Sequence, residues 1–529
     1  MEHIDQTLSR DYQAANIIMI LLVMMTAIIW GTHAKRYLVP TGCDNFGYAR
    51  QAQLFREHGL IGGLNTSIDE PQAKLLIMLS EQVFSSSQAW SEPIAPHCHH
   101  YNSRSRKIIL QYPPGTGLLL SLFPEKVAIS YLLITGTLLS AGTLLWLGIG
   151  RRLSALSVTA IVGAVVALFW TLSCDDAFSS PSIPTTLLLL PTVALCAALF
   201  PSRHLICTFL FGLLCGLLLD VRLPNAILIA GLAIQIFVAK ALWRKANIYA
   251  SRLPIALTAI GFFTGIIPLL LANKINAGGL LKSTYSNIDA SSPIITTQQI
   301  LDGLTYYFTS PFGGTVLMIG AAYILIGFLA YFNSSKRYVP SGTIAATCSL
   351  VLSLLFFVTH SIHTAYYMVP ASIMPIFMVT VEIVSQGEKT PRRRCLLAFL
   401  PLVAWTAFRA STLTPYDMTM KIPTEMMSPS AVTWADITGG TVFYYSGLYT
   451  AKLSFANQFT QNALVDAARK SGHVQYFIID SDQMQRACDH QASRYGVTYV
   501  RTVETLGPKQ VWKIDPSLPG TYEKCELSH

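Results

Sequence analysis

The sequence predicts an α-helical membrane protein that crosses the bilayer about eleven times, with a structured first outer loop and a small C-terminal α/β domain. Three observations support this fold class. Hydrophobic residues make up 52% of the 529 residues and charged residues only 12%, a composition typical of a chain that lies mostly in lipid. Apolar runs long enough to cross a hydrocarbon core of about 30 Å recur from residue 16 to residue 409. The residues that follow are polar and alternate strand-like with helical patterns.

The basic residues between the apolar runs predict the orientation of the chain. Lys and Arg gather in every second connection, for example at Arg151 and Arg152, and such connections face the cytoplasm. An odd number of spans then places the N-terminus in the cytoplasm and the C-terminal domain outside. The net charge of +9 follows from this topology and does not indicate a nucleic-acid partner. We place the spans near 16–32, 127–150, 155–172, 182–200, 205–219, 225–240, 254–272, 313–332, 341–359, 366–385 and 395–409.

The outer loop between the first two spans, at about 33–126, is far longer than the roughly two to eight residues that usually connect packed helices. Within it, apolar residues follow a helical rhythm that predicts an amphipathic helix at the membrane surface, and Asp44 lies at or just before the start of this helix. A carboxylate at the start of a helix serves either as a cap or as a catalytic group, and the spacing leaves both open. The rhythm is carried by Tyr48, Ala52, Phe55 and Leu60, and a second apolar stretch runs from Leu75 to Val83.

The loop ends with Tyr112, Pro113, Pro114 and Gly115, a sequence that ends extended structure and starts a helix. Shortly before this turn stands a basic cluster, formed by Arg104, Arg106 and Lys107, on a side of the membrane where cations are scarce. Such a cluster binds a phosphate group or attracts anionic lipid headgroups, and the two interpretations have equal weight here.

Four of the ten cysteines lie outside the predicted spans in pairs that fit an oxidising exterior. Cys43 and Cys98 share the first outer loop, and Cys488 and Cys525 share the C-terminal domain. Two disulfides are therefore plausible, with free buried thiols as the alternative. Three histidines, His97, His99 and His100, surround Cys98, but their spacing matches no standard zinc pattern, so we predict no metal site.

Several of these features together resemble the GT-C superfamily. One feature is the series Asp44, Tyr48 and Ala52, spaced four residues apart. The others are the Tyr-Pro-Pro-Gly turn with two leucines beyond it, and Arg222 to Asn225 after an apolar helix. Within that superfamily the chain is similar to bacterial members of the dolichyl-phosphate-mannose-protein mannosyltransferase-like group, which includes aminoarabinose lipid A transferases. The stretches 279–285 and 443–447 also resemble those members.

The resemblance implies a glycosyltransferase of the bacterial inner membrane. It would move a hexose or pentose from a polyprenyl phosphate carrier to a hydroxyl group of a glycan, lipid or protein on the periplasmic side. The first-loop aspartate, Asp44, would act as general base, and cations would stabilise the departing lipid phosphate. Because the leaving group is already a phosphate, no cofactor is required, and a divalent metal is possible but not supported. The residues expected to bind donor phosphate are Arg222, Lys282, Lys274, Arg104, Arg106, His360 and His363, and those expected to line the substrate cavity are Tyr48, Tyr112, Asp175, Asp176, Tyr285 and Tyr366.

The chain departs from the pattern of this group at two places. Where related sequences carry a second acid in a Ser-Asp-Val-Pro run, this chain has Ser182 within 181–184, and either Asp175 or Asp176 would replace the missing carboxylate. Where an arginine commonly precedes a late helix, this chain has Tyr366 and Tyr367.

Two other function classes compete with the transferase. A transporter or flippase of lipid-linked saccharides would also need a basic, aromatic-rich cavity, but it would need no essential outer carboxylate. A structural or sensory protein would need neither about eleven spans nor a structured loop. The outer-loop constellation and the lack of an internal repeat favour the transferase. We therefore expect a membrane module at 1–410 and a periplasmic α/β domain at 411–529, with the C-terminal domain binding the acceptor or stabilising the fold.

Overall fold

The computed structural model describes residues 42–87, 90–125, 128, 132, 135–136, 139–140, 143–144, 155–173, 180–199, 205–244, 252–285, 295–332, 340–360, 363–386, 428, 430–435, 442–444, 447–452, 458–480, 497–505, 507–514 and 516. The expected spans at 16–32 and 395–409, most of 127–150, the acids Asp175 and Asp176, and the pair Cys488 and Cys525 lie outside these residues.

The described residues fall into two compact units. The first, which we call the helical unit, lies within Met1–Arg36, Val127–Leu269 and Pro293–Tyr416. The second, which we call the mixed unit, lies within Tyr37–Lys126, Leu270–Ser292 and Asp417–His529. The first outer loop therefore groups with the C-terminal residues, and the expected division of the chain at residue 410 stays a prediction.

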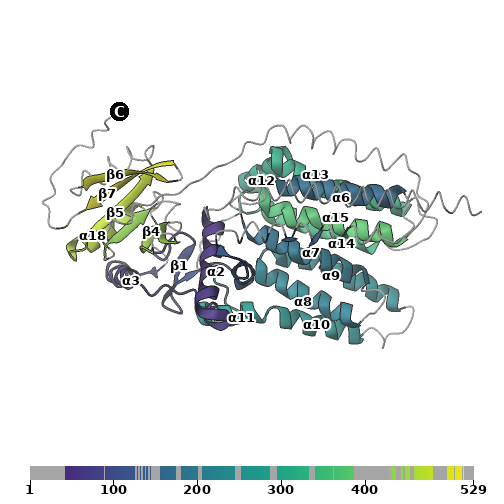
Figure 1. The fold of residues 1–529 in the computed structure, drawn as a ribbon, viewed down its shortest axis with the longest axis horizontal. Coiled ribbons are helices and arrows are strands. Elements are labelled where there is room, and N and C mark those ends of the chain that lie inside the picture. The colour runs from purple at the N-terminus through teal and green to yellow at the C-terminus, as the bar shows by residue number, and fades with distance from the viewer. Residues whose placement is uncertain are drawn as a thin grey trace, which may run out of the picture. The chain divides into compact units, whose positions relative to one another are not determined.

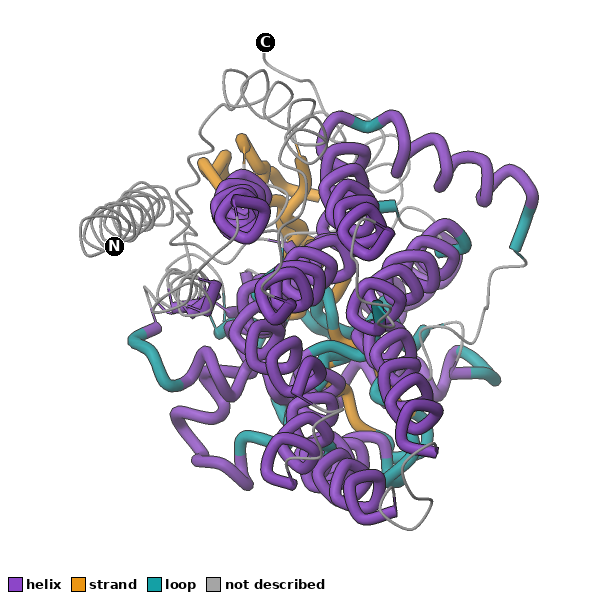
Figure 2. The backbone as a smooth tube through the Cα atoms, turned by 90° about the vertical axis from the view of Figure 1, so that its right-hand side faces the viewer, coloured by secondary structure: helices purple, strands orange, loops and turns teal. Residues whose placement is uncertain are grey.

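Most helices of the helical unit run alongside one another, as the nearly end-on view in Figure 2 shows. Two of them approach closely because glycines face each other: a Cβ atom at Gly212 would lie 2.0 Å from the carbonyl oxygen of Thr258, and one at Gly265 would lie 2.3 Å from that of Leu213. Small residues four apart allow this contact between membrane helices. The helices are α6 (Ala155–Ser173), α7 (Ser182–Leu199), α8 (Leu205–Val221), α9 (Asn225–Arg244), α10 (Arg252–Gly265), α12 (Thr297–Thr309), α13 (Pro311–Phe332), α14 (Ser341–Val358), the 3₁₀ helix η7 (Ala365–Met368) and α15 (Val369–Gln386).

The chain is a multi-pass membrane protein, as the apolar runs predict. Among the described residues, four helical segments are long and apolar enough to cross a membrane: Leu253–Ala277, Pro311–Phe332, Ser341–Val358 and Ala365–Val384. Four shorter apolar helices lie in α6, α7, α8 and α9. The predicted spans between residues 155 and 385 all coincide with helices. Helix α12 was not predicted, because one face of it is polar and it is shorter than a span.

The mixed unit begins with α2 (Gly42–Gly62), the helix expected from the rhythm in the outer loop. Tyr48, Ala52 and Phe55 are buried as predicted, but Leu60 is 68% exposed. The expectation for Leu60 was wrong because Gly59 adopts a φ of 69° and kinks the helix, which turns the following residues away from the buried face. Further helices are α3 (Pro71–Val83), α4 (Pro114–Ser121) and residues 270–277 of α11 (Ile267–Ala277).

Two sheets complete the mixed unit (Figure 1). The smaller is an antiparallel hairpin of β1 (His99–Asn102) and β2 (Lys107–Leu110), which pairs His99 with Leu110. The larger has the order β4-β3-β5-β7-β6; the first three strands are parallel, and β7 pairs antiparallel with both β5 and β6. Its elements are β3 (Val432–Ala435), β4 (Thr450–Lys452), helix α18 (Gln458–Lys470), β5 (Gln475–Asp480), β6 (Val497–Thr505) and β7 (Gly507–Ile514).

A single hydrophobic core joins the outer loop to the C-terminal strands. Trp90 and Tyr101 from the loop share this core with Trp434 and Phe477 from the large sheet. The backbone N–H of Lys452 on the edge strand β4 also donates to the carbonyl groups of Pro93 and Ala95, 3.1 and 3.0 Å away. The loop thereby covers an edge of the sheet that would otherwise be exposed. Residues 442–444, between β3 and β4, are helical.

Candidate functional site

Asp44 is the third residue of α2 and lies in its first turn. A carboxylate at this place is stabilised by the partial positive charge of the helix N-terminus. It is partly exposed, as a group that exchanges protons with a substrate must be. The hydroxyl group of Tyr112 donates a hydrogen bond to Oδ1 of Asp44, at 2.5 Å.

Tyr112 is placed by the turn that the sequence predicts. It follows β2, and Pro113 precedes α4 with a φ of −68°, so the chain leaves the hairpin in a fixed direction. Its side chain is 4% exposed. Burial, and then the negative charge of Asp44, raise the pKa of the Tyr112 phenol well above its usual value. The phenol therefore stays protonated and serves as a donor.

Two more of the predicted cavity residues lie beside Tyr112. The ring of Tyr48 lies 4.5 Å from the Tyr112 ring, between centroids, and the ring of Tyr285 lies 6.4 Å away and edge-on. The segment that carries Tyr285 is tied to the same place, because the hydroxyl of Thr284 donates to the carbonyl group of Gln111 at 2.8 Å. We call Asp44, Tyr48, Tyr112 and Tyr285 the Asp44 site.

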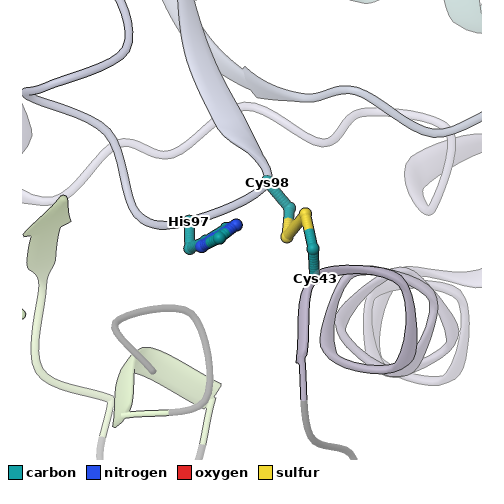
Figure 3. Close-up of side chains that lie close together, drawn as sticks. All are labelled: Cys43, His97 and Cys98. Atoms are coloured by element: carbon teal, nitrogen blue, oxygen red, sulfur yellow. A yellow bond between two sulfur atoms is a disulfide. The ribbon is translucent and has the colours of Figure 1, made fainter. Parts of the chain in front are cut away.

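Cys43 and Cys98 form a disulfide at the edge of the Asp44 site, which agrees with the first of the two proposed pairings (Figure 3). The His97 ring lies beside the two sulfur atoms, and the ligand atoms of the three residues lie within 4.8 Å of one another. A cysteine binds zinc as a thiolate, however, and two sulfurs bonded to each other provide none, which leaves His97 as the one remaining ligand of this cluster. In this state the cluster does not fit a metal.

Two of the three histidines around Cys98 are neutral groups of the core. His99 and His100 are buried, and burial lowers the pKa of His99 to about 3 and that of His100 to about 4. Both pKa values lie far below neutral pH, so neither ring carries a positive charge that would bind phosphate.

The other side of α2 is covered by the short helical segment at 442–444. The guanidinium carbon of Arg50 lies 5.3 Å from the centre of the Phe443 ring. The Phe46 ring lies 6.1 Å from that of Tyr444, again between centroids. Sequence reasoning linked 443–447 to the family resemblance but missed Phe46 and Arg50, although their spacing of four places them on one helix face.

The cations of the mixed unit differ in their surroundings. Lys274, Lys282 and Arg104 are exposed, and none of them forms an ion pair with a carboxylate among the described residues. The side chain of Arg104 lies against Gly278, near the start of the segment that carries Lys282. Arg106 is different, because its guanidinium contacts Glu81 at 3.0 and 3.2 Å.

The helical unit holds Arg222 in the turn between α8 and α9. The side chain is 6% exposed. Its guanidinium carbon lies 5.5 Å from the centre of the Tyr366 ring and 5.0 Å from that of Tyr367. No carboxylate in the described part of the chain lies within ion-pair distance of this guanidinium, so the pair with Asp220 that its position suggests does not form. We call Arg222, Tyr366 and Tyr367 the Arg222 site.

The two histidines predicted to bind phosphate each lie near a tyrosine ring, and for His360 this is a ring of the Arg222 site. The His360 ring lies 5.4 Å from that of Tyr367, and the His363 ring lies 6.2 Å from that of Tyr307. His360 follows the end of α14 at Val358, and His363 precedes the start of η7 at Ala365. Tyr367 was missed as a site residue; its repetition of Tyr366 was the available signal.

The fold is similar to that of known structures, although no protein-family model and no curated protein matches the sequence. The apo crystal structure of ArnT from Cupriavidus metallidurans aligns with a TM-score of 0.52 and 12% identity, over 96% of this chain and 100% of that chain. ArnT bound to undecaprenyl phosphate aligns at 0.47 and 12% identity, over 93% and 97%. The apo oligosaccharyltransferase of Archaeoglobus fulgidus aligns at 0.45 and 11% identity, over 91% and 71%.

The chain therefore shares the fold of ArnT, which agrees with the fold expected from the resemblance, while the expected number of about eleven spans stays a prediction. One fold supports many activities. The activity of this chain is accordingly argued from its own residues.

Proposed function

We propose that this chain is a membrane glycosyltransferase that moves a sugar from a polyprenyl phosphate carrier to a hydroxyl acceptor on the outer face of the membrane. The observation that carries the proposal is the buried cation of the Arg222 site. The fold shared with ArnT and the carboxylate of the Asp44 site support it.

A buried guanidinium without a carboxylate partner is costly, because removing one ion from water costs several kcal/mol, roughly, even after the protein relaxes. The faces of Tyr366 and Tyr367 return only part of this, about 0.5–2 kcal/mol for each cation–π contact. An anion at Arg222 would supply the remainder. Among membrane ligands, a lipid phosphate suits a guanidinium, which offers two parallel N–H donors to two phosphate oxygens.

In the proposed reaction the acceptor hydroxyl oxygen attacks the anomeric carbon of the sugar. The bond from that carbon to the phosphate oxygen breaks, and its electron pair leaves with the polyprenyl phosphate. The hydroxyl proton passes to the Asp44 carboxylate, which acts as general base. Arg222 binds the phosphate and stabilises the charge that develops on it.

The remaining cations receive supporting roles in the proposal. Lys274, Lys282 and Arg104, exposed and without a described carboxylate partner, attract the anionic headgroup of the donor. We leave Arg106 out of this set because Glu81 already neutralises it. Since the leaving group is a phosphate from the outset, we propose that transfer needs no divalent metal, which assays with and without a chelator would test.

The proposal is tested by transfer from labelled polyprenyl phosphate sugars to components of a membrane extract, with purified protein in lipid nanodiscs. Asp44→Asn is expected to lower transfer about 100-fold or more, in the range of general base catalysis, and to leave binding of polyprenyl phosphate intact. Asp69→Asn is the matched control, because Asp69 is an 86% exposed acid of the same unit that pairs with Lys74.

Two outcomes would overturn the proposal. Full transfer by Asp44→Asn would remove this carboxylate from the reaction. Movement of lipid-linked sugar across vesicle membranes, with no transfer to any acceptor, would show a transporter instead.

A further inference from the structure

We propose that Tyr112 is a positioning residue for the base, and that the Cys43–Cys98 disulfide holds the start of α2 where Tyr112 can reach Asp44. This inference rests on the proposed function, since it assigns a role in the same reaction. Tyr112 acts through the carboxylate and does not itself accept the proton.

The contacts form a closed ring around the carboxylate. Asp44 is bonded to Cys43, whose sulfur is bonded to that of Cys98. The carbonyl group of Cys98 accepts a hydrogen bond from the backbone N–H of Gln111 at 3.1 Å, and Gln111 precedes Tyr112. The Tyr112 hydroxyl donates back to Asp44 at 2.5 Å and lies 3.1 Å from the Cys43 sulfur. The base and its donor are thus attached to the same hairpin.

Gly47 provides the space that the Tyr112 ring occupies. A Cβ atom at this position would lie 2.3 Å from Cε2 and 2.6 Å from Cδ2 of Tyr112, far closer than carbon atoms approach without displacement. Any other residue at 47 would push the ring away from α2. The glycine next to Tyr48 therefore serves the contact between Tyr112 and Asp44.

The hydrogen bond has a defined effect on the base. A donor to an ionised carboxylate favours the charged form, so removing or strengthening this donor should change the pH dependence of a reaction in which the carboxylate is the base. It also fixes the orientation of the carboxylate, and misplacement of a reacting group by about 1 Å can cost about 100-fold in rate. Because burial and the Asp44 charge raise the pKa of Tyr112, the phenol keeps its own proton during the reaction.

The first test is Tyr112→Phe, which keeps the ring and removes the hydroxyl. We expect kcat for sugar transfer to fall about 10- to 100-fold, KM for the lipid donor to stay unchanged, and the acid limb of the pH profile to move to higher pH. Tyr101→Phe is the matched control, because it removes the hydroxyl of another buried tyrosine of this unit, which donates to Glu81 at 3.3 Å. It should leave all three quantities as in the parent protein.

The second test replaces Tyr112 with 2,3-difluorotyrosine, which keeps the packing and makes the phenol a stronger donor. The acid limb is then expected to move to lower pH, opposite to the effect of Tyr112→Phe. A purely structural role for Tyr112 would not produce shifts of opposite sign. Gly47→Ala, which keeps the hydroxyl but displaces the ring, should reproduce the loss of kcat seen with Tyr112→Phe.

The outcomes separate this inference from the proposed function. If Asp44→Asn abolishes transfer while Tyr112→Phe keeps the parental kcat and acid limb, the positioning role is wrong and the proposed function stands. A change in donor KM alone would make Tyr112 a donor-binding residue and would also overturn the inference. Full transfer by Asp44→Asn would instead refute the proposed function itself.

Discussion

In the mixed unit the Asp44 carboxylate accepts a hydrogen bond from a buried tyrosine beside a disulfide, whereas in the helical unit the Arg222 guanidinium lies near two tyrosine rings with no described carboxylate in reach. The first charge already has a partner in the unliganded protein. The second meets two ring faces and no carboxylate among the residues that the structure describes. A group with its partner in place is prepared for chemistry, while a buried cation without one is prepared for an anionic ligand.

From the comparison of the two units, we expect the largest effect when Arg222 is substituted. Arg222→Met is expected to weaken binding of polyprenyl phosphate at least about 100-fold, because the phosphate loses its buried guanidinium. The same change should keep or raise the melting temperature of the unliganded protein, since it removes a buried charge that has no carboxylate partner in the described part of the chain. Binding titrations and thermal unfolding, each without and with lipid, measure the two effects.

Arg50→Met is the control for that experiment, because Arg50 also faces an aromatic ring but lies in the mixed unit and donates to Gln53 at 2.9 Å. It should leave the affinity for lipid phosphate unchanged. A large loss of unliganded stability in Arg222→Met would mean that the guanidinium is already satisfied, and the contrast between the two units would not hold.

The next effect concerns the disulfide and is confined to the mixed unit. Replacing both Cys43 and Cys98 by alanine is expected to lower the stability of this unit by about 2–4 kcal/mol, since the bridge closes a separation of 55 residues. Affinity for polyprenyl phosphate at the Arg222 site should not change. Unfolding of the parent protein with and without reductant should show the same difference, and the double variant should be insensitive to reductant.

A third effect is a loss of stability in acid that also belongs to the mixed unit. The pKa of His100 is about 4 in the folded state and 6.5 as its ordinary value, so the unfolded chain binds more protons between these limits. The contribution of neutral His100 to the free energy of unfolding is therefore fully present above pH 6.5. It is lost as the pH falls toward 4, by up to about 3 kcal/mol. His100→Leu, which has nothing to protonate, should flatten the dependence of melting temperature on pH, and an unchanged dependence would contradict the assignment.

The sequence predicted the helices better than it predicted which distant segments pack together. Spans between residues 155 and 385 were found because membrane thickness imposes a minimum length on apolar runs. Helix α12 was not predicted because it is amphipathic and short. Strands β3 and β4 were not predicted, because they have only four and three residues, too few to show the alternation of apolar and polar residues that indicates a strand.

In the candidate site, too, local features were predicted from the sequence and long-range contacts were not. Asp44, Tyr48 and Tyr112 were predicted because helix spacing and a proline turn are local features. The space at Gly47 was not, because nothing in the sequence tells that residue 112 occupies it. The core shared by the outer loop and the C-terminal strands likewise depends on contacts between residues far apart in the chain.

The smallest expected effect tests how the Arg222 site holds its cation. Tyr367→Leu removes the nearer ring face and is expected to weaken lipid phosphate binding about fivefold, the equivalent of about 1 kcal/mol for one cation–π contact. Tyr367→Phe keeps the face and should lose much less, which separates the ring from its hydroxyl. If Leu and Phe weaken binding equally, the hydroxyl contacts the phosphate directly and the ring face is incidental. Arg222 would then share its ligand with a neutral donor, and the contrast with the Asp44 site, where a tyrosine hydroxyl holds the charged group, would become a similarity.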